Sequence, residues 1–391
     1  GGFPKGIVYN IQALGSWLYD KDPFTHLSFE KVMQKIKKQM HEGYFEDLIR
    51  RYLIENNHRS ILVATPKQGL GKKWEAQERK ILKTFKEGLK SNQIDDLIAE
   101  TQKLQELQLA PDSPEALAAL PSLEIEDVPK QTEKYPLEIK SQGDSKILFH
   151  DLFTNDIAYT QIGFNTQSIS DEMIPYIPLL GTLMMGMGTR KHNYTEISKL
   201  VGMHTGGIRT SHFSSATVED RQKVLSYIFF NGKALMEKVD NLFDLFDELF
   251  GEYSFDDTKR LIEIIRSSKA DMEDSIVPHG NHYVSARLQS YQSRLGKFDE
   301  LTDGITYYRF LEQLLERVEK NPAEVANQFR KVAERVFTRK NALFNITSGK
   351  KDYQIIEKRI AGTVDILSGK EWPREEWDLK VEPLNEGLLT A

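Results

Sequence analysis

The sequence contains no cysteine in its 391 residues. This absence excludes disulfide bonds, thiolate nucleophiles and cysteine-ligated metal sites. The chain also lacks an excess of positive charge, because 52 basic and 58 acidic residues give a net charge of −6. Nucleic-acid binding needs clustered positive charge, so the composition argues against nucleic acid as a main partner.

Common catalytic motifs are missing as well. The sequence has no H-x-x-E-H or H-E-x-x-H zinc motif, no G-x-S-x-G serine motif and no P-loop. The acidic stretches DLFDE (244–248) and DELTDG (299–304) lack the calcium-loop pattern and are expected to be solvated helix ends. The uncharged segment 174–189 is too short to span a membrane, so it is predicted to be a buried helix.

Two pairs of histidines are candidates for metal binding. His279 and His282 lie three residues apart, but Pro278 precedes them and glycine and asparagine separate them. Such a sequence is typical of a loop or helix start, where polar side chains cap backbone groups. A structural role is therefore favoured, and a metal site remains the alternative. His204 and His212 flank a glycine pair and have no identifiable third ligand.

The first third of the chain is predicted to be helical. Residues 1–57 contain three helical segments, and 58–66 (HRSILVATP) has the composition of a strand that ends at Pro66. Residues 72–108 are two amphipathic helices separated by SNQ, which predicts an antiparallel helical hairpin. A proline-rich linker follows. Neither end of the chain resembles a natural terminus, so the chain is expected to be part of a longer protein.

The remainder alternates between strands and long helices, which indicates an α+β fold: a mostly antiparallel sheet with helices packed on one face. Asn321, Pro322 and Glu324 form a helix-start signal before an apolar stripe. The predicted strands are 145–150, 157–164, 206–216, 223–235 and 342–347, and the predicted helices are 174–189, 193–205, 256–276, 321–337 and 352–369.

Several stretches together resemble one family, in the order in which they occur there. They are GSWLYDKDPF (15–24), RYLIENNHRSILVATP (51–66), LQLAPDSPEALAALPSLEIEDVP (107–129), LFHDLFTNDIAYTQIGFNT (148–166), the segment 280–314 that begins GNHYVSARLQSYQ, and PLNEGLLTA (383–391). The family is that of presequence-protease-like zinc metallopeptidases, in the pitrilysin and insulinase superfamily. The resemblance covers essentially the whole chain.

The resemblance implies a domain organisation. Family members have four homologous α+β domains in two halves, which are joined by a helical hairpin and close around an unfolded peptide. In this chain, 1–70 would be the C-terminal end of the second domain and 71–110 the hairpin linker. Residues 111–133 would be an extended proline-rich linker and 134–391 the inactive third domain.

The resemblance also implies that this chain carries no active site. The family's zinc is bound by H-x-x-E-H in the first domain, on a helix that continues to a Gly-Thr or Gly-Ser pair. Placing that pair on Gly188 and Thr189 puts Leu179 and Leu183 at the positions of the two histidines and Thr182 at the position of the glutamate. Leucine has no lone pair, and a threonine hydroxyl is a poor base. No catalytic, metal-binding or cofactor-binding residue is therefore expected here.

The implied function is that of a hinge and chamber wall in a zinc-dependent oligopeptidase that degrades unstructured peptides. Zinc would belong to the parent protein, and the partners would be its other domains and unfolded peptides, with no nucleic acid and no membrane. The compartment would be the bacterial cytoplasm or, alternatively, an organelle matrix. The chain alone is expected to be inactive.

Two other functions remain open: an autonomous binding or scaffold protein on a degenerate peptidase fold, and an enzyme with a metal at His279 and His282. The helices of 1–57 are expected to bury their apolar stripes on the hairpin or on a second copy of the chain, because exposed patches of this kind drive association.

Overall fold

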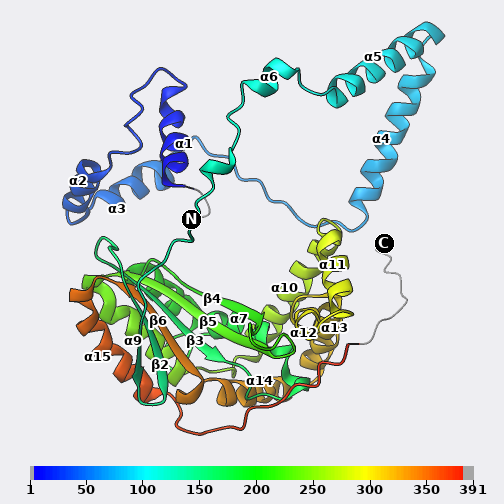
Figure 1. Cartoon of the computed structure of the whole chain (residues 1–391). Coiled ribbons are helices and arrows are strands. Elements are labelled where there is room, and N and C mark those ends of the chain that lie inside the picture. Colours follow the sequence, from blue (N-terminus) through cyan, green and yellow to red (C-terminus); the bar gives the residue numbers. More distant parts are fainter. Residues whose placement is uncertain (1–3, 382–391) are drawn as a thin grey trace. The chain divides into compact units, whose positions relative to one another are not determined.

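The computed structural model describes residues 4–381 and divides into two compact units, Gly1–Glu124 and Ile125–Ala391 (Figure 1). Each unit is described by itself below. Across the described residues, no helix combines the length and the apolar character that crossing a membrane requires.

The first unit begins with the three predicted helices, but their apolar side chains are not buried. Ile11 is 61% exposed and Leu18 is 73% exposed, so the predicted burial of this stripe on the hairpin is wrong. The unit's fourth and fifth helices leave these side chains uncovered. The helices are α1 (Lys5–Trp17), α2 (Glu30–Met40) and α3 (Tyr44–Ile49), which continues into a π-helical turn, η1 (Arg50–Ile54).

The predicted strand at 58–66 does not form. Residues in this range have no strand assignment, and Ile61, Leu62 and Val63 are 85%, 93% and 77% exposed. A strand needs a neighbour to which its backbone N–H and C=O groups can bond. The described part of this unit contains no strand with which the segment could pair, so the segment forms no strand.

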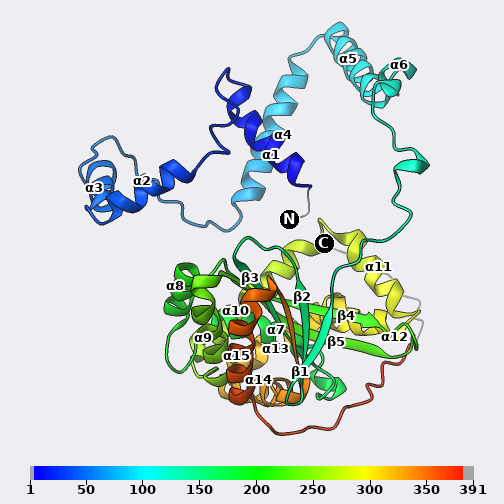
Figure 2. The same cartoon turned by 60° about the vertical axis from the view of Figure 1, so that its left-hand side comes forward.

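The next two helices are present, but they do not pack as a hairpin. They are α4 (Leu70–Glu87) and α5 (Ser91–Leu109), and they diverge from the short turn that joins them (Figures 1 and 2). Their apolar side chains meet near this turn, around Phe85, Leu89 and Ile94. Farther along, Trp74 and Leu107 are 63% and 68% exposed, so the predicted antiparallel packing is wrong for most of the length.

The second unit contains a six-stranded sheet in the order β1-β2-β6-β3-β5-β4. Four of its five strand pairs are antiparallel, and only β2 and β6 are parallel. The mostly antiparallel sheet predicted from the sequence is therefore confirmed. The strands are β1 (Glu138–Gln142), β2 (Ser145–Asp151), β3 (Ile157–Asn165), β4 (Ile208–Ala216), β5 (Val224–Leu235) and β6 (Ala342–Ser348).

Helices cover one face of this sheet, as predicted, and α9, α14 and α15 gather on that side (Figures 1 and 2). Alternate strand residues such as Ile162, Phe230 and Phe344 are fully buried against them. The helices are α7 (Tyr176–Gly186), α8 (Tyr194–His204), α9 (Val239–Gly251), α10 (Thr258–Ile276), α11 (Gly280–Ser290), α12 (Arg294–Thr302), α13 (Ile305–Lys320), α14 (Pro322–Val336) and α15 (Lys350–Ile366).

Local signals explain where several helices begin. Asn321 caps α14 by accepting the backbone N–H of Glu324 at 3.3 Å, as the sequence predicts. Asn193 and Glu196 form a reciprocal capping box at the start of α8. These contacts satisfy backbone donors that have no partner within the helix.

An extended segment after α15 packs back onto the unit. The indole N–H of Trp377 donates to the carbonyl of Ile169 at 2.9 Å, and its ring stacks on Phe298 at 5.1 Å between centroids. Trp377 and Leu379 are each 4% exposed. This segment therefore belongs to the core of the second unit.

Candidate functional site

Helix α7 contains Leu179, Thr182 and Leu183, the residues at the positions of the family's zinc motif. It is the predicted buried helix, and Leu179 and Leu183 are 1% and 0% exposed. Thr182 faces outward instead, and its hydroxyl donates to the carbonyl of Pro178, at 3.4 Å. The helix packs against β4, α10 and α14. Its apolar side chains fill the core and offer no donor to a metal ion or a water molecule.

The turn after α7 depends on Gly188. Its φ is +85°, and a Cβ there would lie 2.7 Å from the carbonyl oxygen of His192 and the nitrogen of Tyr194. A side chain at this position would therefore clash with backbone atoms as well as strain the backbone. The next hydroxyl, Thr189 Oγ1, accepts the backbone N–H groups of Lys191 at 3.1 Å and of His192 at 3.0 Å.

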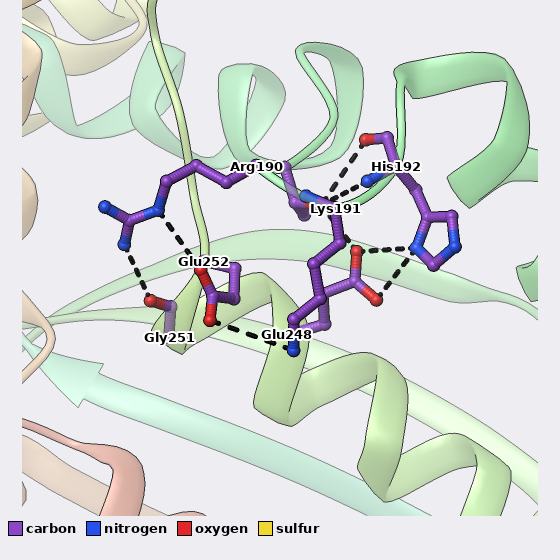
Figure 3. A network of polar contacts seen from close by, with 7 residues as sticks. Arg190, Lys191, His192, Glu248, Gly251 and Glu252 are labelled. Atoms are coloured by element: carbon purple, nitrogen blue, oxygen red, sulfur yellow. Dashed lines mark hydrogen bonds and ion pairs between the residues drawn. The ribbon is translucent and has the colours of Figure 1, made fainter.

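Charged side chains attach this turn to the end of α9 (Figure 3). Thr189 Oγ1 donates to Glu248 Oε1 at 2.5 Å, and His192 Nδ1 lies 3.0 Å from the same oxygen. Arg190 Nε donates to Glu252 Oε2 at 3.1 Å, and its guanidinium also reaches the carbonyl of Gly251 at 3.0 Å. All of these contacts hold the turn on the helix. The Gly-Thr pair is therefore structural in this chain.

The four histidines of the two candidate metal-binding pairs lie at α11, at the end of α8 and on β4. His279 precedes α11 as its N-cap residue without a side-chain cap, and His282 Nε2 lies 3.2 Å from Asp303 Oδ2. His204 ends α8, whereas His212 is on β4. Within residues 4–381, no three histidine or acidic side chains come close enough together to hold a metal ion. The predicted helix start is confirmed, because His279 is the N-cap residue of α11. A cap by its side chain is not formed, because the imidazole makes no hydrogen bond to the backbone of the first turn.

His212 lies in a mostly polar environment that nevertheless excludes much of the solvent. Its Nε2 is 3.0 Å from Ser226 Oγ, and its ring lies 5.6 Å from that of Phe298. Burial lowers the pKa of His212 to about 4, because the charged imidazolium loses hydration there. The imidazole is therefore neutral at physiological pH.

The acidic stretch DELTDG was expected to be solvated, and this expectation is wrong. Glu300 is 0% exposed, and its Oε1 lies 3.0 Å from Arg287 Nη1. The same oxygen accepts the backbone N–H and the hydroxyl of Thr306, each at 2.9 Å. Asp299 accepts the hydroxyl of Ser214 at 2.6 Å, and burial raises its pKa. Partners outside the stretch offset the cost of removing these carboxylates from water.

The second acidic stretch, DLFDE, is likewise only partly solvated. Asp247 Oδ2 lies 3.2 Å from Arg359 Nη2, and Oδ1 accepts the hydroxyl of Thr363 at 2.5 Å. Burial raises the pKa of Asp247, although these two partners act in the opposite direction. Glu248 belongs to the turn network described above. Sequence reasoning missed all of these partners, because spacing within the stretch does not reveal them.

Comparison with known proteins places these features in a family context. The family model that describes a domain associated with peptidase M16, subfamily C, matches residues 65–314. Protein HypA of Clostridium perfringens is 32% identical over 390 residues, which is 100% of this chain and 40% of that protein. Presequence protease 1, chloroplastic/mitochondrial, of Arabidopsis thaliana is 29% identical over 394 residues, which is 100% of this chain and 36% of that protein.

This chain therefore spans well under half the length of the curated relatives that it matches. Among solved structures, a peptidase M16 inactive domain from Pseudomonas fluorescens gives a TM-score of 0.41 at 14% identity, over 63% of this chain and 53% of that one. Such a similarity is too weak to support an argument about function. The family assignment depends on the sequence relatives.

Proposed function

Because the chain belongs to the family associated with peptidase M16, subfamily C, and is a middle segment of a pitrilysin-type protein, we propose that it is a non-catalytic part of a zinc-dependent oligopeptidase. The parent protein would degrade unstructured peptides. The observation that carries this proposal is the family match over residues 65–314 together with the apolar helix α7.

Zinc does not fit the residues that helix α7 has at the positions of the family motif. Zinc is bound by nitrogen, sulfur or carboxylate oxygen donors, usually three or four of them. The side chains at the positions expected for the family motif are Leu179, Thr182 and Leu183, and two of these three are buried among other apolar groups. The ligands of the parent's zinc would therefore lie in another part of the protein, and no catalytic step is assigned to this chain.

The proposed work of the chain is steric. Helices α4 and α5 would form the hinge between two halves of the parent, and the sheet of the second unit would form part of a chamber wall. We divide the chain accordingly into the end of a preceding domain (1–70), the hinge (71–110), a linker (111–133) and a third peptidase-like domain (134–391). A closed chamber admits unfolded peptides and excludes folded proteins, and hinge motion controls access to it.

The relatives also suggest the partners and the compartment. The parent's remaining domains would cover the exposed apolar side chains of the first unit, such as Ile61 and Leu62. The relatives include a clostridial protein and a chloroplastic/mitochondrial protease. We propose the bacterial cytoplasm for this chain, with an organelle matrix as the alternative.

An assay of the purified chain with an internally quenched peptide tests the proposal. We expect no cleavage, with or without added zinc, and no stoichiometric zinc in metal analysis. Because His282 is the remaining ligand candidate, His282→Ala is the matched variant and should leave the metal content unchanged. Zinc-dependent cleavage that co-purifies with the chain, or bound zinc that His282→Ala removes, would show that the chain is itself an enzyme.

A further inference from the structure

The face of the sheet opposite the helices has an uneven distribution of charge. Alternate strand residues face this side, and within the six strands, all of which are described, none of these residues is Asp or Glu. The two strand carboxylates, Glu138 and Asp151, belong to the helix side: Asp151 accepts the backbone N–H of Lys350 at the start of α15. The basic residues of the open face include Lys146, Arg209 and Lys233. This face is thus positive in a chain whose net charge is −6.

A row of amide side chains crosses the open face. Strand register places Arg209 opposite Asn231, Asn231 opposite Gln161, and Gln161 opposite Asn345. Gln161 Nε2 donates to Asn231 Oδ1 at 2.8 Å, and Asn345 Nδ2 donates to Gln161 Oε1 at 2.6 Å. Asn231 Nδ2 in turn donates to Ser211 Oγ at 2.9 Å. Four strands are thereby connected by a fixed polar floor.

A cavity of about 490 Å³ lies over this floor. Arg209 and Lys233 line it together with Tyr159 and Thr347, and no carboxylate lines it. Lys233 is opposite Tyr159 in the register, and its aliphatic chain lies against Gly206, where an added Cβ would come within 2.8 Å of it. Lysine and arginine side chains on a surface are ordinarily hydrated. Here Arg209 and Lys233 line the same cavity, and no acidic residue lines it with them.

The floor also has an unused acceptor. Asn345 Oδ1 is buried and has no hydrogen-bond partner in the structure. A buried carbonyl oxygen without a partner costs free energy. Because this oxygen lies beneath the surface of the floor, the groups that the cavity offers to a ligand are its two cations, Arg209 and Lys233.

An apolar surface adjoins the polar cavity on the same face. Phe229 lies over Gly163, where an added Cβ would be 2.4 Å from its ring, and Tyr227 stacks on Phe229 at 5.8 Å between centroids. Phe213, opposite Tyr227, is 48% exposed. A ligand with a carboxylate at one end and apolar side chains along its length matches this arrangement.

We propose that the cavity between Arg209 and Lys233 binds the carboxylate of an extended peptide, with the apolar side chains of the peptide toward Phe229. The inference builds on the proposed function, because it assigns a substrate-binding site to the non-catalytic wall. The carboxylate can be the C-terminus of the peptide or an acidic side chain. Both present the same pair of oxygens to the two cations.

Fluorescence anisotropy with the full chain and short labelled peptides of serine, glycine, threonine and leucine tests this site. One peptide carries a free C-terminal acid and one a C-terminal amide; two further amidated peptides carry an internal glutamate or glutamine. We expect a carboxylate to tighten binding by about fivefold, and high salt to remove the preference. Preference for the free acid identifies the C-terminus as the source, and preference for glutamate identifies a side chain.

Variants assign the preference to the cavity. Arg209→Gln and Lys233→Gln are each expected to weaken binding of the carboxylate peptide, and the double variant should bind acid and amide peptides equally. Lys146→Gln, which removes a cation from the same face on β2 and outside the cavity, is the matched control and should retain the preference. Both cationic side chains of the cavity are exposed, so circular dichroism and the thermal midpoint should be unchanged.

Two results would overturn the inference: equal binding of acid and amide peptides by the wild-type chain, or a preference that survives the double variant. Neither result would contradict a non-catalytic role in a peptidase, because binding to this face is measured without hydrolysis. Conversely, zinc-dependent cleavage by the purified chain would contradict the proposed function while leaving a carboxylate preference intact. The two experiments therefore fail independently.

Discussion

The ion pair between Arg287 and Glu300 removes two charges from water in the second unit. Glu300 is 0% exposed, and the Arg287 side chain is 14% exposed. Removing ions from water is costly, and the attraction between them offsets that cost only when further hydrogen bonds complete the arrangement. Thr306 supplies two of those bonds, through its N–H and its hydroxyl. The pair joins the end of α11 to α12 and the start of α13.

We expect Glu300→Ala to lower the free energy of unfolding by about 3–5 kcal/mol, because Arg287 would remain as a buried cation without its carboxylate. Urea unfolding followed by tryptophan fluorescence measures this loss. Glu319→Ala is the matched control, since it removes the carboxylate of an ion pair with Arg266 that is about half exposed on both sides. Its expected cost is below about 1 kcal/mol. Equal effects of the two variants would contradict the role assigned to Glu300.

His212 predicts a dependence of stability on pH. Its pKa is about 4 in the folded chain and 6.5 in the unfolded one, so between these values the unfolded state binds the extra proton. The free energy of unfolding should therefore fall as the pH is lowered from about 6.5 to about 4, by roughly 3 kcal/mol at most. Asp299, whose pKa burial raises, acts in the opposite direction.

Urea unfolding at several pH values isolates the histidine when wild type and His212→Gln are compared, since Asp299 is common to both. The variant should lose less stability on acidification than the wild type does. His58→Gln, which removes an exposed histidine of the first unit, is the control and should keep the wild-type slope. A His212→Gln slope equal to that of wild type would show that folding does not lower the pKa of this histidine.

At the scale of helices and strands, local signals predicted α7, α8, α10, α14 and α15 of the second unit, whereas α9, α11, α12 and α13 were not predicted. The stripe Val325, Phe329, Val332 and Val336 in α14 is 0% exposed throughout, and its Asn321 cap forms. Helix α7 was predictable because an uncharged segment has little other place in a folded chain. In each case the information lies within a few turns of helix, which a sequence pattern contains.

Strand pairing was less predictable, because it depends on residues far apart in the chain. The strands at 145–150 and 157–164 follow one another with a short connection, yet β6 pairs with both and lies between them. β1, at the sheet edge, has a weak pattern and was not predicted. The segment 58–66 has strand composition and no partner. Composition thus predicts the tendency to form a strand, and the neighbour determines whether one forms.

The candidate site likewise combines local features that the sequence predicts with long-range contacts that it does not. Its lack of metal donors can be read directly from the residues of α7. The contacts of Thr189 and His192 with Glu248 could not be read from the sequence, because these residues are 59 and 56 positions apart. Nor could the buried state of Glu300, since a solvated acidic cluster and a paired one have the same sequence pattern. The row of polar side chains on the open face could not be predicted from the sequence, because the register of four strands brings its residues together.

At the scale of the whole molecule, the two units differ in how much apolar surface they bury. The second unit has a continuous core of fully buried aromatic and aliphatic side chains. In the described part of the first unit, Ser16 is the single buried residue, and large apolar side chains from Ile7 to Leu109 are exposed. Exposed apolar surface on this scale marks a site of association. The unpaired segment 58–66 adds backbone donors and acceptors to it.

We therefore expect the isolated chain to self-associate through its first unit. Sedimentation velocity should show a mean mass that rises with protein concentration, because apolar surface buried between copies stabilises the oligomer. Leu62→Lys, at a side chain that is 93% exposed, should shift the distribution toward monomer. Ile355→Lys, at a side chain on α15 that is 50% exposed, makes the same chemical change in the second unit and should leave the distribution unchanged. A chain that stays monomeric at every concentration would show that the first unit rearranges to cover its own apolar side chains.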